Sequence, residues 1–178
     1  RYLFHRLPSV RRFDDGRIAV VDLGASRVRV YDARGRHLFD AGGPGEGPGE
    51  FQRPWFLTRV ADTMVVYQSP PARFSWFDDA GAFLRTFTVP QPPGDLPVYG
   101  YVFGRFDDGS YALSAGSPGA PAERPGRARE SATVRRLQLD PPAIDELFTI
   151  PTEEVLVHPS GGWNDVTFGR TTYVAADG

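Results

Sequence analysis

The amino-acid sequence predicts an all-β protein, built as part of a β-propeller of four-stranded antiparallel blades. Residues 27–35 match residues 73–81 at a constant spacing of 46 positions, most clearly where Arg, an aromatic residue, Asp and Gly recur. Short segments of alternating apolar and polar residues are common, whereas helical periodicity is nearly absent. Self-similarity with a period of this size is typical of propeller blades, which pack face to face around an axis.

The first two repeats divide into four strands each, separated by turn signals rich in Asp and Gly. We expect the strands of the first repeat at residues 9–13, 17–22, 27–31 and 36–41. The strands of the second are expected at residues 55–59, 63–67, 73–77 and 83–89. A third repeat begins with strands at 100–106 and 110–114. Large apolar residues of these repeats form the predicted core: Phe13, Val30, Phe39, Phe51, Phe56, Tyr67, Trp76, Phe87 and Phe106.

The third repeat carries an insertion. Leu139 and Asp140 are the counterparts of Phe77 and Asp78 but lie 62 positions further on, a surplus of 16 over the regular spacing. The stretch 116–131 has this length and is rich in Gly, Pro and Arg. We therefore expect a loop over residues 116–131, and its lack of aromatic residues favours disorder.

These repeats define approximate blade boundaries. Blade one covers residues 8–50, blade two 51–97, blade three 98–159 with the inserted loop, and the start of a fourth blade 160–178. Because closed propellers use about 4–8 blades, we expect this chain to be the N-terminal part of a longer protein. The open edge of the last blade predicts that the chain alone self-associates.

Two motifs of the first repeat resemble those of a known family. The stretch 42–51 reads Gly-Gly-Pro-Gly-Glu-Gly-Pro-Gly-Glu-Phe, and residues 15–22 read Asp-Gly-Arg-Ile-Ala-Val-Val-Asp. Both are similar to motifs of NHL-like six-bladed β-propellers of bacteria, and the resemblance covers residues 8–89. It implies a ring of six blades, frequent export from the cell, and mostly binding or uncharacterised functions. The second linker, 90–97, lacks the Gly-Glu-Phe pattern.

Composition excludes several chemistries. The chain has no Cys, and all 20 basic residues are Arg, so thiol catalysis, thiolate metal sites and lysine Schiff bases are ruled out. The net charge of −2 is spread along the chain, which argues against nucleic-acid binding. No apolar segment approaches the ~18 residues of a membrane span. Two Pro residues and two Glu residues make the stretch 42–51 a poor phosphate loop, and we expect it to connect blades with Phe51 tucked between them.

Two groups of residues are candidates for ligand binding. Arg53, Trp55 and Arg59 run from the first linker into a predicted inner strand, where Arg beside an aromatic residue can bind an anion, a glycan or a peptide carboxylate. The second group surrounds a loop that is expected to connect blades, because such loops form the face on which propellers usually bind ligands. Its members are His158, Trp163, Asn164 and Asp165.

We predict a non-catalytic scaffold, located outside the cytoplasm, that binds a protein, peptide or glycan on one propeller face. The basis is an abundance of blade signals without a convergent catalytic constellation: no Gly-x-Ser-x-Gly elbow occurs, and the Asp pairs lie in predicted turns. No cofactor is expected for this scaffold. The alternative is a propeller enzyme of the lactonase or lyase type with a divalent metal such as calcium near the axis.

Overall fold

The computed structural model describes residues 4–90, 100–115, 125–158 and 163–165, and all of its regular elements are β-strands. The chain forms two compact units, Arg1–Gln91 and Pro92–Gly178. Among the described residues, no helix has the length and apolarity needed to cross a membrane.

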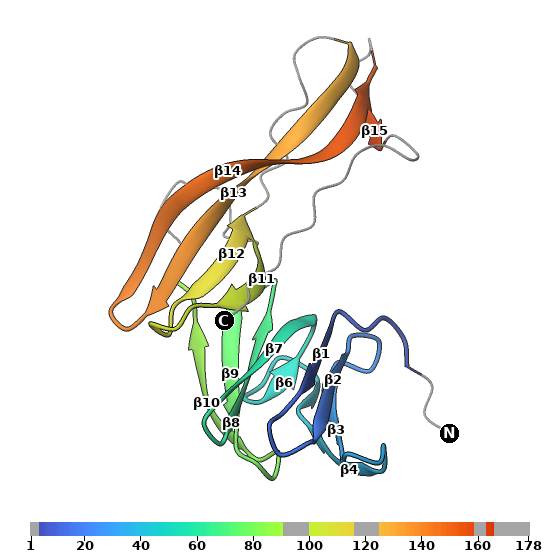
Figure 1. Cartoon of the computed structure of the whole chain (residues 1–178), viewed down its shortest axis with the longest axis vertical. Helices are drawn as coiled ribbons and strands as arrows, with labels where there is room; N and C mark the ends of the chain where they lie inside the picture. The colour runs from blue at the N-terminus through green and yellow to red at the C-terminus, as the bar shows by residue number, and fades with distance from the viewer. Residues whose placement is uncertain (1–3, 91–99, 116–124, 159–162, 166–178) are drawn as a thin grey trace. The chain divides into compact units, whose positions relative to one another are not determined.

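The first unit contains two four-stranded antiparallel sheets with strands in chain order (Figure 1). One sheet consists of β1 (Ser9–Arg12), β2 (Ile18–Asp22), β3 (Arg27–Tyr31) and β4 (His37–Ala41). The other consists of β7 (Pro54–Val60), β8 (Thr63–Gln68), β9 (Arg73–Phe77) and β10 (Phe83–Thr88). Between them, β5 (Gly43–Pro44) and β6 (Glu50–Phe51) pair in parallel. These two meanders confirm the predicted all-β fold with four-stranded blades.

The repeat in the sequence is also a repeat of backbone structure. Asp32 accepts hydrogen bonds on its Oδ1 from the backbone N–H groups two and four residues later, both at 2.9 Å. Asp78 accepts the same two bonds at 2.9 and 2.8 Å. Both turns also place a Gly at positive φ three residues after the Asp. The matching residues of the sequence are therefore those that close the same turn in each sheet.

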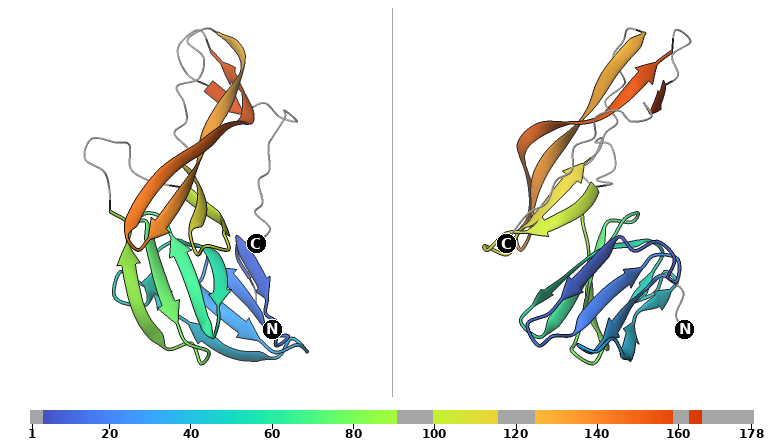
Figure 2. Two further views of the ribbon diagram at one scale, coloured as in Figure 1. Left: turned by 60° about the vertical axis from the view of Figure 1, so that its left-hand side comes forward. Right: turned by 45° about the vertical axis from the view of Figure 1, so that its right-hand side comes forward.

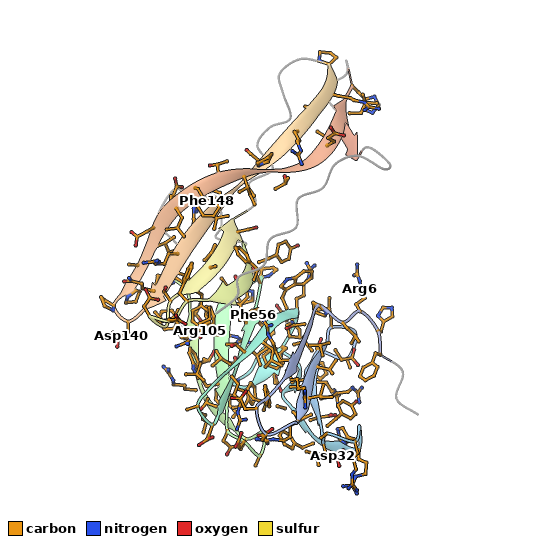
Figure 3. The ribbon with its side chains drawn as sticks, in the orientation of Figure 1. Arg6, Asp32, Phe56, Arg105, Asp140 and Phe148 are labelled. Carbon is orange, nitrogen blue, oxygen red and sulfur yellow. The ribbon has the colours of Figure 1, made fainter. Side chains whose placement is uncertain are left out.

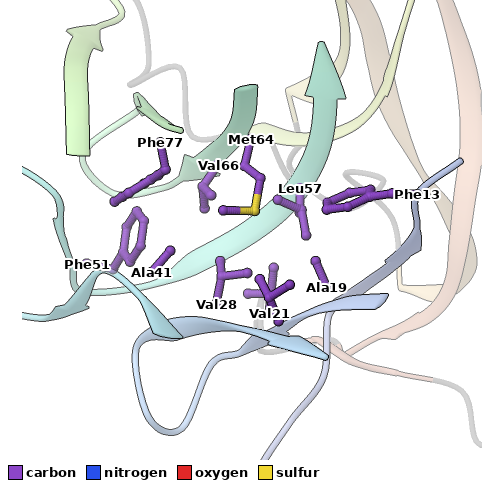
Figure 4. Packing of buried hydrophobic residues seen from close by; sticks show 11 residues of the cluster. Phe13, Ala19, Val21, Val28, Ala41, Phe51, Leu57, Met64, Val66 and Phe77 are labelled. Carbon is purple, nitrogen blue, oxygen red and sulfur yellow. The ribbon is translucent and has the colours of Figure 1, made fainter. Parts of the chain in front are cut away.

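The two sheets of the first unit lie against each other (Figure 2), and an apolar core fills the space between them (Figure 4). β-Branched and aromatic residues of β2, β3, β8 and β9 meet there because the strands alternate in which face their side chains occupy. Phe51 is fully buried in this core, and its ring lies 5.7 Å from that of Phe77. The predicted position of Phe51 between the blades is thus confirmed.

Most of the predicted core is confirmed. Six of the nine predicted residues are buried, and Phe39 is partly buried against the same cluster. The buried six are Phe13, Val30, Phe51, Phe56, Tyr67 and Trp76. Phe87 and Phe106 are only partly buried. Phe87 lies on β10, the outer strand of its sheet, where one face remains open to solvent.

The second unit is a five-stranded antiparallel sheet in chain order. Its strands are β11 (Gly100–Arg105), β12 (Tyr111–Ala115), β13 (Gly126–Leu139), β14 (Pro142–Val157) and β15 (Trp163–Asp165). β13 and β14 form a long twisted hairpin (Figure 1). The hairpin turns at Asp140, the predicted counterpart of Asp78.

The loop expected over residues 116–131 is wrong in its second part. Residues 126–131 begin β13, where Gly126 pairs with Val157 and Ser131 with Pro151. The composition of this segment suggested a loop, but its backbone finds partners along the extended β14. Residues 116–124 lie outside the described residues.

The start of the expected fourth blade is also placed differently. Its described residues, Trp163–Asp165, form β15 and pair with β14 as an outer strand of the same sheet. The remainder of that blade, residues 166–178, lies outside the described residues. The boundaries of the blades therefore stay predictions.

Candidate functional site

A cavity of about 330 Å³ opens in the first unit, at the end where the linker 42–53 meets the turn between β8 and β9. We call this end of the two sheets the loop end. The cavity is lined by Glu46, Gln52, Gln68, Pro71 and Arg73. The linker between the sheets and the turn between the second and third strands thus meet at this cavity.

The Gly-rich linker builds one wall of the cavity. It folds back on itself through hydrogen bonds from Gly45 N to Phe51 O at 3.1 Å and from Glu50 N to Gly47 O at 3.0 Å. Gly42 has a φ of +70°, and a Cβ atom there would collide with the Phe51 ring. The linker therefore needs glycine to bring Phe51 into the core and leave Glu46 at the cavity.

Arg73, the first residue of β9, ties this wall to the second sheet. Its Nη1 donates to the carbonyl of Glu46 at 3.1 Å, and its Nη2 donates to the carbonyl of Glu50 at 2.6 Å. Among the described residues, no carboxylate forms an ion pair with Arg73. The guanidinium thus brings a positive charge to the cavity while it fixes the linker.

Gln68, the last residue of β8, is the buried polar residue of the cavity. Its side chain is fully buried, and its Oε1 accepts a long hydrogen bond of 3.3 Å from Gln52 N. Its Nε2 has no hydrogen-bond partner among the described residues. A buried donor without a partner costs about 1–3 kcal/mol, so this position favours a group that accepts from it.

The opposite end of the first unit carries a cluster of charges, which we call the Arg–Asp cluster: Asp15, Arg17, Arg59 and Asp79. Arg59 contacts Asp15 at 2.8 Å and Asp79 at 2.9 Å, and Arg17 contacts the same two carboxylates at 2.7 and 2.9 Å. Hydrogen bonds from the Arg17 side chain and backbone, and from Arg59, hold the pKa of the Asp15 carboxyl well below its ordinary value.

The structure separates the first group of predicted site residues. Arg53 is exposed and follows Gln52 of the cavity, and Trp55 is partly buried at the start of β7. Arg59 lies at the other end of β7, in the Arg–Asp cluster, with its guanidinium carbon 4.9 Å from the centre of the Phe13 ring. Arg59 therefore packs two sheets together, away from Arg53 and Trp55, and its role in ligand binding stays a prediction.

The second group of predicted residues lies in the second unit. His158 follows β14, and Trp163, Asn164 and Asp165 form β15. The backbone of Trp163 pairs with that of Val157, the neighbour of His158. The structure thus brings these four residues to one pair of strands, and their role in binding stays a prediction.

Sequence reasoning missed Gln52, Gln68, Pro71 and Arg73. A single Gln at the end of a strand carries no motif, and Arg73 stood out only as part of the repeat. A second cavity, of about 250 Å³, lies in the second unit beside Asp108. Asp108 is engaged there by Ser110 and by Arg136 at 3.6 Å. Among the described residues, no three His, Asp or Glu side chains gather as metal ligands.

Comparison with known proteins identifies the fold. No family model and no curated protein matches the sequence. A protein of Bacteroides fragilis that is named as an exported protein matches with a TM-score of 0.53 and 14% identity, over 75% of this chain and 35% of that chain. The virginiamycin B lyase of Staphylococcus aureus matches with a TM-score of 0.52 and 12% identity, over 89% of this chain and 54% of that chain.

A second lyase structure, a streptogramin B lyase, matches with a TM-score of 0.52 and 12% identity, over 89% of this chain and 53% of that chain. The chain therefore spans between about a third and about half of the length of these three proteins. At such identities the likeness shows the fold alone. The chain has the fold of part of a β-propeller.

Proposed function

We propose that the chain is part of a non-catalytic β-propeller scaffold that binds its partner, a protein, peptide or glycan, at the loop end of the blades. One observation carries this proposal: the cavity at the loop end contains Gln68, whose buried Nε2 has no partner among the described residues. Buried polar groups in folded proteins are nearly always paired. A bound ligand can supply the hydrogen-bond acceptor that Gln68 Nε2 requires.

The proposed scaffold is a six-bladed ring of the NHL-like type. The repeat of 46 residues between the two blades of the first unit and the linker motif ending at Phe51 support this proposal. The propeller fold of the structural neighbours agrees with it. In such a ring the loop ends of successive blades lie side by side, so a ligand can contact more than one blade.

The proposed location is outside the cytoplasm. One structural neighbour is named as an exported protein, and NHL-like propellers of bacteria are frequently exported. A chain without Cys is compatible with an oxidising compartment as well as a reducing one. Fractionation of the source cells with an antibody to the chain tests the location directly.

A binding screen tests the scaffold. The full-length protein is applied to a glycan array and to a peptide library, and binders are titrated by calorimetry with and without EDTA. We expect saturable binding that EDTA does not change, with the ligand recovered at its original mass. A ligand that is converted to a new product overturns the non-catalytic proposal.

A metal-dependent lyase is the second candidate, because two of the structural neighbours are named as a virginiamycin B lyase and a streptogramin B lyase. Calcium or another divalent metal is a cofactor only under this proposal. Metal analysis of the full-length protein and incubation with virginiamycin B distinguish the two candidates. Stoichiometric metal together with EDTA-sensitive cleavage favours the enzyme.

A further inference from the structure

The two blades of the first unit place a buried polar residue at the same position, the end of the second strand. Asp22 ends β2 and Gln68 ends β8, and their exposed fractions are 1% and 0%. Asp22 pairs in register with Arg27, and Gln68 pairs with Arg73. Since the two pairs are structurally equivalent, blade one shows what this position requires for stability alone.

In blade one the buried carboxylate is satisfied by its own blade. Asp22 Oδ1 accepts a hydrogen bond from Ala25 N at 3.1 Å, and Oδ2 accepts one from Arg29 Nε at 3.2 Å. The neighbouring Arg27 forms an ion pair with Asp40 at 2.9 Å. Each charged group at the end of blade one therefore has a partner in its own sheet.

Blade two has lost the equivalent donors. The counterpart of Ala25 is Pro71, which has no N–H to donate. The counterpart of Arg29 is Ser75, whose Oγ lies 3.4 Å from Thr86 Oγ1. Gln68 thus keeps a buried polar side chain at a position where blade two no longer supplies its partners.

The Arg residue next to the buried polar side chain also has different partners in the two blades. The counterpart of Asp40 is Thr86, so Arg73 lacks the carboxylate with which Arg27 pairs. Arg73 donates instead to two backbone carbonyls of the linker. All three partners are replaced in blade two, and Gln68, Pro71 and Arg73 line a cavity. This combination points to a site for a ligand from outside the chain.

The lining of the cavity determines the class of ligand. Glu46 and Arg73 place opposite charges on its wall. An anionic ligand is repelled by the Glu46 carboxylate and a cationic ligand by the Arg73 guanidinium, so the wall favours a neutral ligand. Within the described part of the chain, Gln68 Nε2 is a donor without a hydrogen-bond partner. Glu46 Oε1 accepts from Gln52 Nε2 at 2.6 Å, and Glu46 Oε2 is left there as an acceptor. A hydroxyl group both donates and accepts, which suits such a wall.

We infer that this cavity binds one ring of a neutral sugar. A sugar oxygen accepts from Gln68 Nε2, a neighbouring hydroxyl donates to Glu46, and the Pro71 ring contacts the C–H face of the sugar. The cavity volume of about 330 Å³ suits a ligand of one ring. The 3.3 Å bond that holds Gln68 is long, so its amide can turn toward the ligand. This inference rests on the proposed binding function of the loop end.

The test replaces Gln68 by an apolar residue of similar length. The full-length protein and its Gln68→Met variant are titrated with methyl glycosides of glucose, galactose, mannose and N-acetylglucosamine, with glucuronic acid, and with a capped neutral tripeptide. We expect at least one neutral glycoside to bind, and Gln68→Met to bind it about tenfold more weakly. We also expect the melting temperature of Gln68→Met to equal or exceed that of the wild type, because the variant removes an unpaired buried donor.

Asp22→Met is the matched control at the equivalent position of blade one. It leaves Arg29 without its buried carboxylate, so we expect a lower melting temperature with unchanged sugar affinity. Side-chain amide NMR signals of Gln68 are expected to shift with the neutral sugar.

Three outcomes overturn the sugar assignment. Neutral sugars that bind Gln68→Met as well as the wild type show another site. Tighter binding of glucuronic acid shows an anion site. Binding of the tripeptide but of no sugar contradicts the sugar assignment and leaves the proposed binding function standing. If neither these probes nor the array and library bind, the proposed function fails as well.

Discussion

The protonation of Asp15 in the Arg–Asp cluster links the stability of the first unit to pH. Its folded pKa is held below the value of an unfolded chain, about 3.9, by hydrogen bonds from Arg17 and Arg59. Its contribution is therefore complete above about pH 4 and is lost as the pH falls toward the folded pKa. Because its side chain is 39% exposed, solvent screening limits this contribution to about 1 kcal/mol.

We expect Asp15→Asn to lower the free energy of unfolding by about 1 kcal/mol at pH 7, and the difference from wild type to shrink below pH 4. Urea unfolding at pH 7, 5 and 3 measures this change. Asp62→Asn is the control, because Asp62 is 90% exposed and lies 3.5 Å from Arg59, and we expect almost no effect. A difference between Asp15→Asn and wild type that grows in acid contradicts the assignment.

Gly42 offers a second test at the scale of single residues. Gly42→Ala places a side chain at φ +70° and pushes it into the Phe51 ring, so we expect a loss of about 2 kcal/mol or more in stability. Gly43→Ala is the matched control, since a Cβ there meets nothing within 4 Å. Thermal melts of both variants compare them. Equal melting temperatures would show that the linker does not hold Phe51 in the core.

The residues of the cavity illustrate what could and could not be predicted from the sequence. The meeting of the linker with the turn between the second and third strands could be predicted, because blade topology puts both at one end of the sheets. Gln68 could not be predicted from a motif, since it stands out only because its buried Nε2 has no hydrogen-bond partner among the described residues. Comparing the blades position by position, Asp22 with Gln68 and Ala25 with Pro71, is the signal that would have found it.

At the scale of elements, the strands of the first two blades could be predicted to within about two residues. Alternation of apolar residues and Asp-Gly turns are local signals, and burial of the apolar residues in the core stabilises the same strand register. The start of β13 could not be predicted, because the partner of residues 126–131 is the far part of β14. Pairing over such a distance leaves little trace in local composition, which here resembled a loop.

Amide hydrogen exchange tests this extension of the hairpin. We expect alternate backbone amides over residues 126–131 to exchange slowly, because this part of β13 pairs with β14 on one side. Ala128→Pro, opposite Val155, is expected to abolish that protection while leaving residues 133–137 slow, since these also pair with β12. Rapid exchange over residues 126–131 in the wild type would contradict the strand and favour the loop that the composition suggests.

At the scale of the whole molecule, the repeat explains both the stability and the proposed function of the first unit. Equivalent turns, such as those at Asp32 and Asp78, keep the same hydrogen bonds and make two blades of one type. Positions at the loop end depart from that equivalence. A repeat protein can change one copy of a position while the other copies keep the scaffold stable, so the departures at Gln68 are consistent with the proposed binding at the loop end.

The second unit exposes several large apolar side chains. Tyr101, Leu147, Phe148 and Leu156 are 40–55% exposed, and Phe148 projects from β14 (Figure 3). Exposed apolar side chains on a sheet favour association with another copy.

We therefore expect the 178-residue chain alone to self-associate in sedimentation velocity experiments, and Phe148→Ser to weaken the association about tenfold. Leu38→Ser is the control, because Leu38 is 47% exposed on the outer strand of a complete blade, where we expect no change. A sharp monomeric profile of the wild-type chain with a cooperative melt would contradict the prediction, since it would show that the open face is stable in water.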